Sequence, residues 1–184
     1  MILISLKHGI LGLLSYNDMT GYDLSKYFDQ SLQFFWNAQK SQIYRDLGNL
    51  EEKEFVESNI VHQKGKPDKK VYSITKNGEE ELVNWINQYS FEDSMKIRDS
   101  FLMRIFFSAK GNNQNLKIAL QEYIQQHQIY LDNLDNIKKK YIKEDYLEDS
   151  NDYIYWAMSI KKGYYNFKAN IEWANDILEM LDDL

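Results

Sequence analysis

Two stretches in the C-terminal half of this 184-residue chain repeat apolar residues at alternating steps of three and four, each for more than three heptads. This spacing is typical of helices that pack along a narrow apolar seam. The first stretch comprises Leu116, Leu120, Tyr123, His127, Tyr130, Leu134, Ile137 and Tyr141. The second comprises Ala157, Ile160, Tyr164, Phe167, Ile171, Ala174, Leu178 and Leu181. The acidic segment 144–152 joins them, so the pattern predicts two long helices in a helical hairpin.

The second of these helices carries more aromatic side chains than one partner helix can cover. They are Tyr153, Trp156, Tyr164, Tyr165, Phe167 and Trp173. We therefore expect two copies of the chain to pair, most simply about a two-fold axis. The residues predicted at this dimer interface are Phe101, Leu102, Phe106, Trp156, Ile160, Tyr164, Phe167, Ile171, Leu178 and Leu181. The alternative is that these side chains close on the N-terminal half of the same chain.

The N-terminal half has shorter helical patterns. Apolar residues at helical spacing predict a first helix over residues 3–14. Thr20, with Asp23 three residues on, resembles a capping box and opens a second helix that runs to about Phe28. A third helix fits residues 39–53, with an apolar stripe on one side and a polar, basic face on the other. Three helices of which the last is amphipathic in this way match a helix-turn-helix unit.

The period of the pattern then changes. Residues 55–61 and 71–75 are rich in strand formers, and Gly65, Pro67 and Asp68 lie between them, which predicts a β-hairpin. The segment from His62 to Lys76, with Lys76 included, contains five lysines and a single aspartate, although the net charge of the chain is −6. A hairpin with a basic tip is the wing of a winged helix-turn-helix. A fourth helix, which Thr75 is expected to cap, follows the hairpin.

The chain contains one proline and eight glycines, so little interrupts long helices. The fold class predicted is mainly α. A winged helix-turn-helix DNA-binding domain with a two-stranded wing occupies residues 1–90, and an all-α dimerisation domain occupies residues 91–184. A helix from about residue 95 to residue 108 opens the second domain.

Several short pieces of sequence occur in a fixed order. They are Ile10-Leu11-Gly12-Leu13-Leu14, Gly21-Tyr22-Asp23-Leu24, Ile43-Tyr44-Arg45-Asp46-Leu47, Leu50-Glu51-Glu52-Lys53, the run from Gly65 to Thr75, and Gly78. In this order they resemble the PadR family of winged-helix transcription regulators, over roughly residues 3 to 86. The length and the helical C-terminal half resemble the longer branch of that family, in which the C-terminal helices form the dimer.

The resemblance implies a sequence-specific DNA-binding regulator that acts as a homodimer on a palindromic operator and needs no metal or other cofactor. It implies repression, in some relatives relieved by a small aromatic ligand, whereas other relatives activate transcription. The alternative function is a winged-helix module for protein contacts or assembly that binds no specific DNA.

Two positions depart from the family pattern. The family usually places Gly where Glu54 stands, and a left-handed helix cap without Gly costs roughly 1 kcal/mol, so we expect this turn to differ. The wing of the family often carries Arg where Lys66 and Lys69 stand. Lysine makes point-charge contacts with phosphates and suits a narrow minor groove less well. The wing is therefore expected to position the protein more than it specifies sequence.

The residues predicted to contact DNA share a polar or basic side chain on the second helix, the third helix or the wing. They are Tyr22, Lys26, Gln39, Lys40, Ser41, Gln42, Tyr44, Arg45, Lys64, Lys66, Lys69 and Lys70. Gln42 suits adenine and Arg45 or Lys40 suits guanine in the major groove, whereas the wing lysines suit phosphates. For each lysine taken alone, a solvated surface charge is the simpler interpretation.

Large aromatics also suggest a cavity for a small ligand between domains or subunits, with plain core packing as the alternative. The candidate lining residues are Trp85, Phe101, Phe106, Trp156 and Trp173. No enzyme is predicted, because the three histidines show no metal spacing and no nucleophile stands in a recognisable constellation. His127 lies in a heptad seam, which favours a hydrogen-bonded core or interface histidine over a pH sensor. The acidic cluster at 144–152 favours a solvated loop over a calcium site.

Nothing in the sequence indicates export or membrane insertion. The first residues lack the basic start of a signal peptide, and no apolar run approaches the roughly 18 residues that a membrane span needs. The chain has no cysteine, which excludes disulfides. The expected location is the cytoplasm, and the expected partners are double-stranded DNA, a second copy of the chain and a small aromatic effector.

Overall fold

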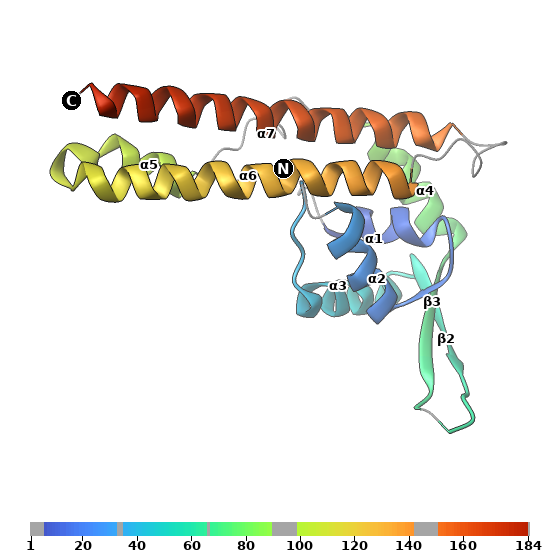
Figure 1. Ribbon diagram of the computed structural model, residues 1–184. Helices are drawn as coiled ribbons and strands as arrows, with labels where there is room; N and C mark the ends of the chain where they lie inside the picture. Colours follow the sequence, from blue (N-terminus) through green and yellow to red (C-terminus); the bar gives the residue numbers. More distant parts are fainter. Residues whose placement is uncertain (1–5, 33–34, 66, 90–98, 142–150, 184) are drawn as a thin grey trace. The chain divides into compact units, whose positions relative to one another are not determined.

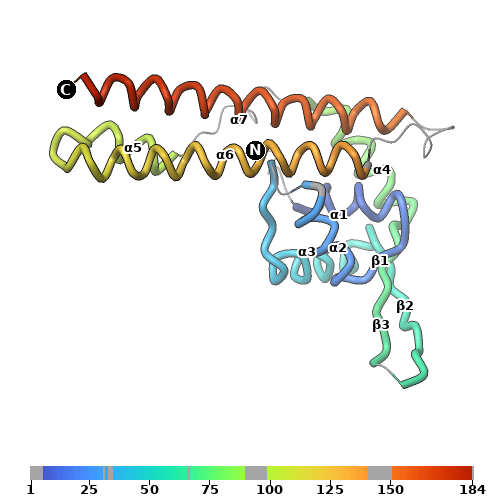
Figure 2. Tube along the Cα trace, in the orientation of Figure 1, coloured from blue at the N-terminus to red at the C-terminus, as the bar shows by residue number. Residues whose placement is uncertain are grey.

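The computed structural model describes residues 6–32, 35–65, 67–89, 99–141 and 151–183. It divides into two compact units, Met1–Lys96 and Ile97–Leu184, which Figures 1 and 2 show as ribbon and tube. The predicted domain boundary at residues 90–91 lies outside the described residues. The mainly helical class with an N-terminal winged helix and a helical C-terminal region is confirmed.

The first unit contains the predicted helices. They are α1 (Leu6–Leu14), α2 (Gly21–Tyr27), α3 (Lys40–Glu52) and α4 (Lys76–Ile86). The Thr20 side chain accepts a hydrogen bond from the backbone N–H of Asp23 at 3.1 Å, so the predicted capping box is confirmed. A short π-helix (Phe28–Leu32) continues α2. The spacing of apolar residues did not indicate this π-helix. The buried ring of Phe28 at its start packs into the core beside Gly9.

Three strands form one antiparallel sheet in the order β1-β3-β2. They are β1 (Met19–Thr20), β2 (Val56–Val61) and β3 (Lys69–Ile74). The hairpin of β2 and β3 is the predicted wing, and it projects beyond the helices of its unit (Figure 1). Strand β1 was not predicted, because two residues are too few to show alternation. It pairs Met19 with Tyr72 and so ties the base of the wing to the start of α2.

Thr75 joins the wing to α4. Its hydroxyl accepts the backbone N–H of Gly78 at 3.1 Å and donates to the carbonyl oxygen of Glu54 at 2.6 Å. Its own N–H donates to the carbonyl oxygen of Phe55 at 3.1 Å. A Cβ on Gly78 would lie 2.1 Å from that same Phe55 oxygen. Glycine at position 78 is therefore what allows the first turn of α4 to approach the backbone that follows α3.

Helix α3 ends in a left-handed turn at Glu54, where φ is 58°. The N–H of Glu54 donates to the Glu51 carbonyl at 3.0 Å, and the N–H of Phe55 donates to the Leu50 carbonyl at 2.9 Å. These two bonds form a Schellman motif. The expectation that a non-glycine residue would change the turn is wrong, because the surrounding bonds, including the one from Thr75, hold Glu54 in the strained conformation.

Replacing Glu54 by glycine is expected to raise the free energy of unfolding by about 0.5–1 kcal/mol. The strain energy that glycine relieves in the folded state exceeds the free-energy cost of the greater conformational entropy that it gives the unfolded chain. Urea unfolding of the full-length protein measures this. The matched control is Glu52→Gly, inside α3, which should lower the free energy of unfolding by a similar amount, about 0.5–1 kcal/mol. A loss of stability in Glu54→Gly would contradict the strain argument.

The second unit contains α5 (Ser100–Phe106), the 3₁₀ turn η3 (Ser108–Lys110), α6 (Asn113–Tyr141) and α7 (Asp152–Asp182). The predicted helix over 95–108 is shorter than expected at its C-terminal end, and its predicted start lies outside the described residues. Helices α6 and α7 pack side by side as the predicted hairpin (Figures 1 and 2). Leu120, Leu134, Ile137, Ile160 and Ala174, all from the two seams, are buried.

Polar groups in the seam have partners across the hairpin. His127 donates from Nδ1 to the Tyr123 carbonyl at 2.8 Å, and its Nε2 accepts from the Asn170 amide at 3.0 Å. This pattern corresponds to the neutral imidazole, as expected for a hydrogen-bonded seam histidine. The Tyr164 hydroxyl donates to Asp135, and burial together with this bond raises the pKa of Tyr164 to about 12. None of the described helices combines the length and apolar character that a membrane crossing requires.

Candidate nucleic-acid interface

Helix α3 divides cleanly into a buried and an exposed face. Ile43, Leu47 and Leu50 are buried in the core of the first unit. On the opposite face the predicted contact residues Gln39, Lys40, Ser41, Tyr44 and Arg45 are exposed. The Arg45 side chain is 69% exposed, with Asp46 at 3.9 Å as an ion-pair partner. The first two turns of α3 therefore present hydrogen-bond donors to solvent.

Two tyrosines flank Lys40 on this face. The Lys40 Nζ lies 5.5 Å from the centre of the Tyr22 ring and 5.9 Å from that of the Tyr44 ring. The Tyr44 ring lies against Gly21, where a Cβ would come within 2.6 Å of a ring carbon. Glycine at the start of α2 thus makes room for the ring. Lys40 and Tyr44 are neighbours at i and i+4 of α3, whereas Tyr22 comes from α2, so sequence spacing gave no sign of the contact with Tyr22.

The side chain of Gln42 helps to cap the N-terminus of its own helix. Its Oε1 accepts the backbone N–H of Gln39 at 3.1 Å, and the residue is half-buried. A bidentate contact with adenine uses the oxygen and the nitrogen of the amide together. Such a contact by Gln42 requires this capping bond to break or to be shared. Lys26, on α2, is exposed.

The wing lysines do not share one environment. Lys64, in the turn, and Lys69, at the start of β3, are exposed, whereas Lys66 lies outside the described residues. Successive residues of a strand point to opposite faces, so Lys70 lies on the other face of the hairpin from Lys69. There the Lys70 Nζ donates to Oε2 of Glu51, on α3, at 2.7 Å.

Asp68 closes the tip of the wing. Its carboxylate lies 2.8 Å from Nδ1 of His62 and accepts the backbone N–H of Gln63 at 3.3 Å. The one acidic side chain of the basic run is therefore engaged across the hairpin. Lys64 and Lys69 remain as the exposed ammonium groups of the described part of the tip.

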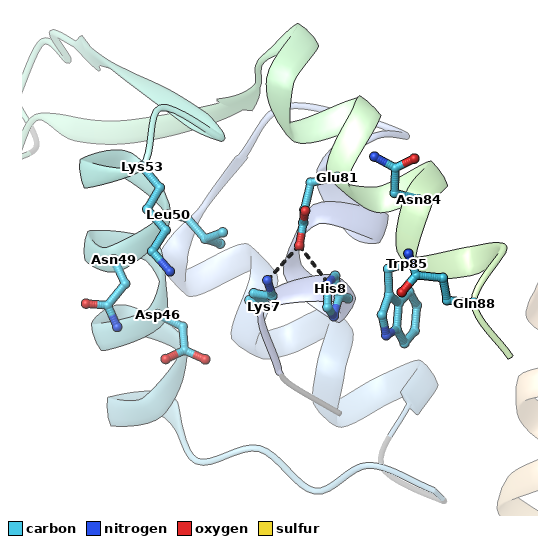
Figure 3. A pocket seen from close by; sticks show the side chains of 10 residues that line it. All are labelled: Lys7, His8, Asp46, Asn49, Leu50, Lys53, Glu81, Asn84, Trp85 and Gln88. Carbon is cyan, nitrogen blue, oxygen red and sulfur yellow. Dashed lines mark hydrogen bonds and ion pairs between the residues drawn. The ribbon is translucent and has the colours of Figure 1, made fainter. Parts of the chain in front are cut away.

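A pocket of about 560 Å³ lies among α1, α3 and α4 in the first unit (Figure 3). It is lined by Lys7, His8, Asp46, Asn49, Leu50, Lys53, Glu81, Asn84, Trp85 and Gln88. Lys7 Nζ and His8 Nε2 both meet Oε1 of Glu81, at 2.7 Å and 3.2 Å. The His8 ring stacks on Trp85 with 4.4 Å between centroids.

The electrostatics of the pocket follow from these contacts. Burial lowers the pKa of His8 below its ordinary value, against the opposing effect of Glu81, so the stacked imidazole is neutral near pH 7. The ammonium of Lys7 lowers the pKa of Glu81. The lining residues from α3 are Asp46, Asn49 and Leu50, and Asn49 lies one helical turn after Arg45. A molecule in this pocket would contact the C-terminal half of α3.

The residues predicted for the ligand cavity divide between the two units, so that cavity stays a prediction. Trp85 lines the pocket of the first unit. In the second unit Phe101 stacks on Tyr123 at 4.8 Å and Trp173 meets the same ring edge-on at 5.8 Å. Phe106 is 80% exposed, and Trp156 is half-buried.

The predicted dimer contacts also vary in exposure within one chain. Ile160 is buried in the hairpin, and Leu102 is exposed beside Phe106. The others are half-buried: Phe101, Trp156, Tyr164, Phe167, Ile171, Leu178 and Leu181. Their role between two copies stays a prediction.

Comparison with known families divides the chain at the same place as the structure. Residues 10–84 match the model of the transcriptional regulator PadR-like family. Residues 97–182 match the model named virulence activator alpha C-term. The two matched segments correspond to the winged-helix unit and the helical unit.

Known proteins resemble the chain over nearly its whole length. The negative transcriptional regulator PadR of Bacillus subtilis is 29% identical over 96% of this chain and 97% of its own. Its crystal structure with operator DNA has a TM-score of 0.79 at 27% identity, covering 96% of this chain and 98% of that one. Its structure with p-coumaric acid has a TM-score of 0.72 at 27% identity, covering 96% and 95%. The virulence activator AphA of Vibrio cholerae has a TM-score of 0.72 at 26% identity, covering 97% and 99%.

Proposed function

We propose that the chain is a cytoplasmic repressor that binds a palindromic operator as a homodimer. It belongs to the PadR-like family of transcriptional regulators and is not an enzyme. The observation that carries this proposal is the outward face of α3. Lys40 and Arg45 stand exposed there on a helix whose other side is fixed in the core. The same unit carries a hairpin with exposed lysines at its tip.

The proposed division of labour follows from side-chain chemistry. The first turns of α3 enter the major groove, where Arg45 and Lys40 donate to guanine and Ser41 to either base type. Lys64 and Lys69 on the wing meet phosphates and release counterions. Phosphate contacts fix the register of the protein on the duplex, and base contacts select the sequence.

Pairing of two copies through the C-terminal helices is supported by apolar side chains that one chain leaves in solvent. Phe106, Leu102, Met158 and Tyr165 are among them, and all are exposed. A dimer with two-fold symmetry presents two α3 helices to half-sites of opposite orientation, which is why the operator is expected to be palindromic.

A small aromatic acid is the proposed effector class. The support is the Bacillus subtilis relative, whose structure was solved with p-coumaric acid. In this chain the pocket among α1, α3 and α4 offers the Trp85 ring for stacking and the ammonium of Lys53 for a carboxylate. A ligand there would reach the helix that carries Lys40 and Arg45.

The experiment is selection of duplexes from a random-sequence pool by the full-length protein. The affinity for the selected duplex is then measured between about 50 and 300 mM salt, a range over which the Debye length falls by more than half. We expect enrichment of an inverted repeat, a strongly negative slope of log K against log salt, and one dimer per duplex. Addition of p-coumaric acid should release the DNA. A pool without enrichment would overturn DNA regulation, and a reporter gene activated from the selected site would overturn repression alone.

A further inference from the structure

Lys70 stands apart from the other lysines of the wing. We infer that Lys70 is a positioning residue that holds the wing against α3 through Glu51, and that it does not contact phosphate. The inference rests on the proposed DNA-binding function and revises the role predicted for this lysine from the sequence. It assigns to Glu51, an acidic residue on a DNA-binding unit, a favourable part in binding.

One carboxylate connects three elements. Glu51 belongs to the last turn of α3, and its Oε2 accepts from Lys70 Nζ, on β3, at 2.7 Å. Its Oε1 accepts from the hydroxyl of Ser58, on β2. Both oxygens are therefore used, one for each strand of the wing. A hairpin held at two points on neighbouring strands cannot rotate freely about its base.

The contact of Lys70 continues into the core. Its Nζ lies 4.9 Å from the centre of the Tyr72 ring, two residues further along the same face of β3. Tyr72 is buried, and it pairs with Ser58 on one side and Met19 on the other. The ammonium thus sits between a fixed ring and a fixed helix. The hydrogen bond with Glu51 raises the pKa of Lys70, and the bond with Lys70 lowers the pKa of Glu51.

The lysines at the tip of the wing differ from Lys70 in their surroundings. Lys69 and Lys64 are exposed, and Lys69 projects from the opposite face of the hairpin. The charge of Lys70, in contrast, is balanced by Glu51. A balanced charge releases no counterion on binding DNA, so it adds nothing to the salt slope.

The physical role of this clamp, the pair Glu51–Lys70, is geometric. Both side chains remain partly in solvent, at 34% and 47% exposure, so the pair adds little to the stability of the fold. It instead fixes the angle between the helix that would enter the groove and the hairpin that would meet the neighbouring backbone. Without the clamp the wing must be ordered at the moment of binding, and affinity falls.

The deciding experiment uses the duplex that the full-length wild-type protein selects, and a scrambled duplex of the same composition. If the clamp operates, Glu51→Gln and Lys70→Gln each weaken binding to the selected duplex by about three- to fivefold. This size is within the range expected for the loss of two exposed pairs, one in each protomer. The double variant is no weaker than either single variant. Lys70→Gln leaves the salt slope unchanged, and the charge-swapped double variant E51K/K70E recovers affinity.

A phosphate contact predicts the opposite signs. Removal of Glu51 would then tighten binding, because a negative charge leaves the DNA-facing surface and Lys70 is released. Lys70→Gln would reduce the magnitude of the salt slope by about 0.9 for each protomer, or about 1.8 for the dimer. Either result would overturn the inference.

Matched controls separate the clamp from general charge effects. Glu52→Gln removes the same charge from the adjacent position of α3 and should leave affinity unchanged or slightly tighter. Lys69→Gln should reduce the magnitude of the salt slope by about 0.9 for each protomer, or about 1.8 for the dimer. Thermal unfolding should be nearly unchanged in all of these variants, since each side chain is at least partly in solvent. A wild-type protein that selects no duplex would overturn the proposed function and the inference together, whereas a bound duplex with an unchanged Glu51→Gln affinity would overturn the inference alone.

Discussion

Replacing Lys40 and Arg45 together by alanine is expected to abolish discrimination between the selected operator and random DNA. Each side chain is exposed on the first two turns of α3, where a donor reaches a base edge. Loss of one such contact costs roughly 1–3 kcal/mol in specific binding. A homodimer carries each substitution twice, so if both residues read bases the combined loss is roughly 4–12 kcal/mol. This loss is comparable with the usual margin of about 4–10 kcal/mol between specific and non-specific binding.

The single variants distinguish how the two residues contribute. Lys40 lies between the rings of Tyr22 and Tyr44, which hold its ammonium in place. The Arg45 side chain is mostly in solvent, with Asp46 at 3.9 Å. Titration of labelled operator and scrambled duplexes at one salt concentration measures the ratio of the two affinities for each variant. The control is Lys53→Ala, which removes the same charge from the side of α3 that lines the pocket and should leave the ratio unchanged. Equal losses on both duplexes would mean that Lys40 and Arg45 bind only phosphates.

Replacing Gly78 by alanine is expected to lower the free energy of unfolding by about 2–3 kcal/mol, as for an overpacked core. The new methyl carbon would begin 2.1 Å from the carbonyl oxygen of Phe55. That oxygen also accepts the N–H of Thr75, so it cannot turn away without the loss of a second bond. Because the obstacle is backbone, α4 must move from the turn that follows α3.

The control for this substitution is Gly48→Ala, in the interior of α3. A Cβ there meets nothing within 4 Å, so only helix propensity changes, and stability should rise by about 1 kcal/mol. Urea unfolding, with hydrogen exchange at the amides of α4 as a local probe, measures both variants. Similar rises in the two variants would show that α4 can shift away from Phe55 at little cost.

Much of the site could be predicted because its residues are consecutive. The outward face of α3 follows from helical spacing alone, since Ile43, Leu47 and Leu50 define the buried side. The wing follows from a change of period and from turn residues. The cap at Thr75 follows from a hydroxyl at the start of a helical pattern. Each of these inferences depends on local geometry that repeats every two or every 3.6 residues.

Contacts between distant segments had no such signal. The bond between Glu51 and Lys70 joins residues 19 positions apart, and the one between Lys7 and Glu81 joins residues 74 apart. The left-handed conformation of Glu54 was judged unfavourable from local cost, yet bonds from Phe55 and Thr75 impose it. Strand β1 exists only because β3 lies beside it.

Hydrophobic periodicity thus specified the longer helices, the two strands of the wing and the face that each one buries, because burial of apolar area is additive along a segment and independent of the exact neighbour. Which charges are balanced and which stay available to a partner depended on the folded arrangement. A hydrogen bond forms only within about 3 Å and in the right direction. Only the packed unit brings Glu51 to Lys70 and leaves Lys40 and Arg45 facing solvent.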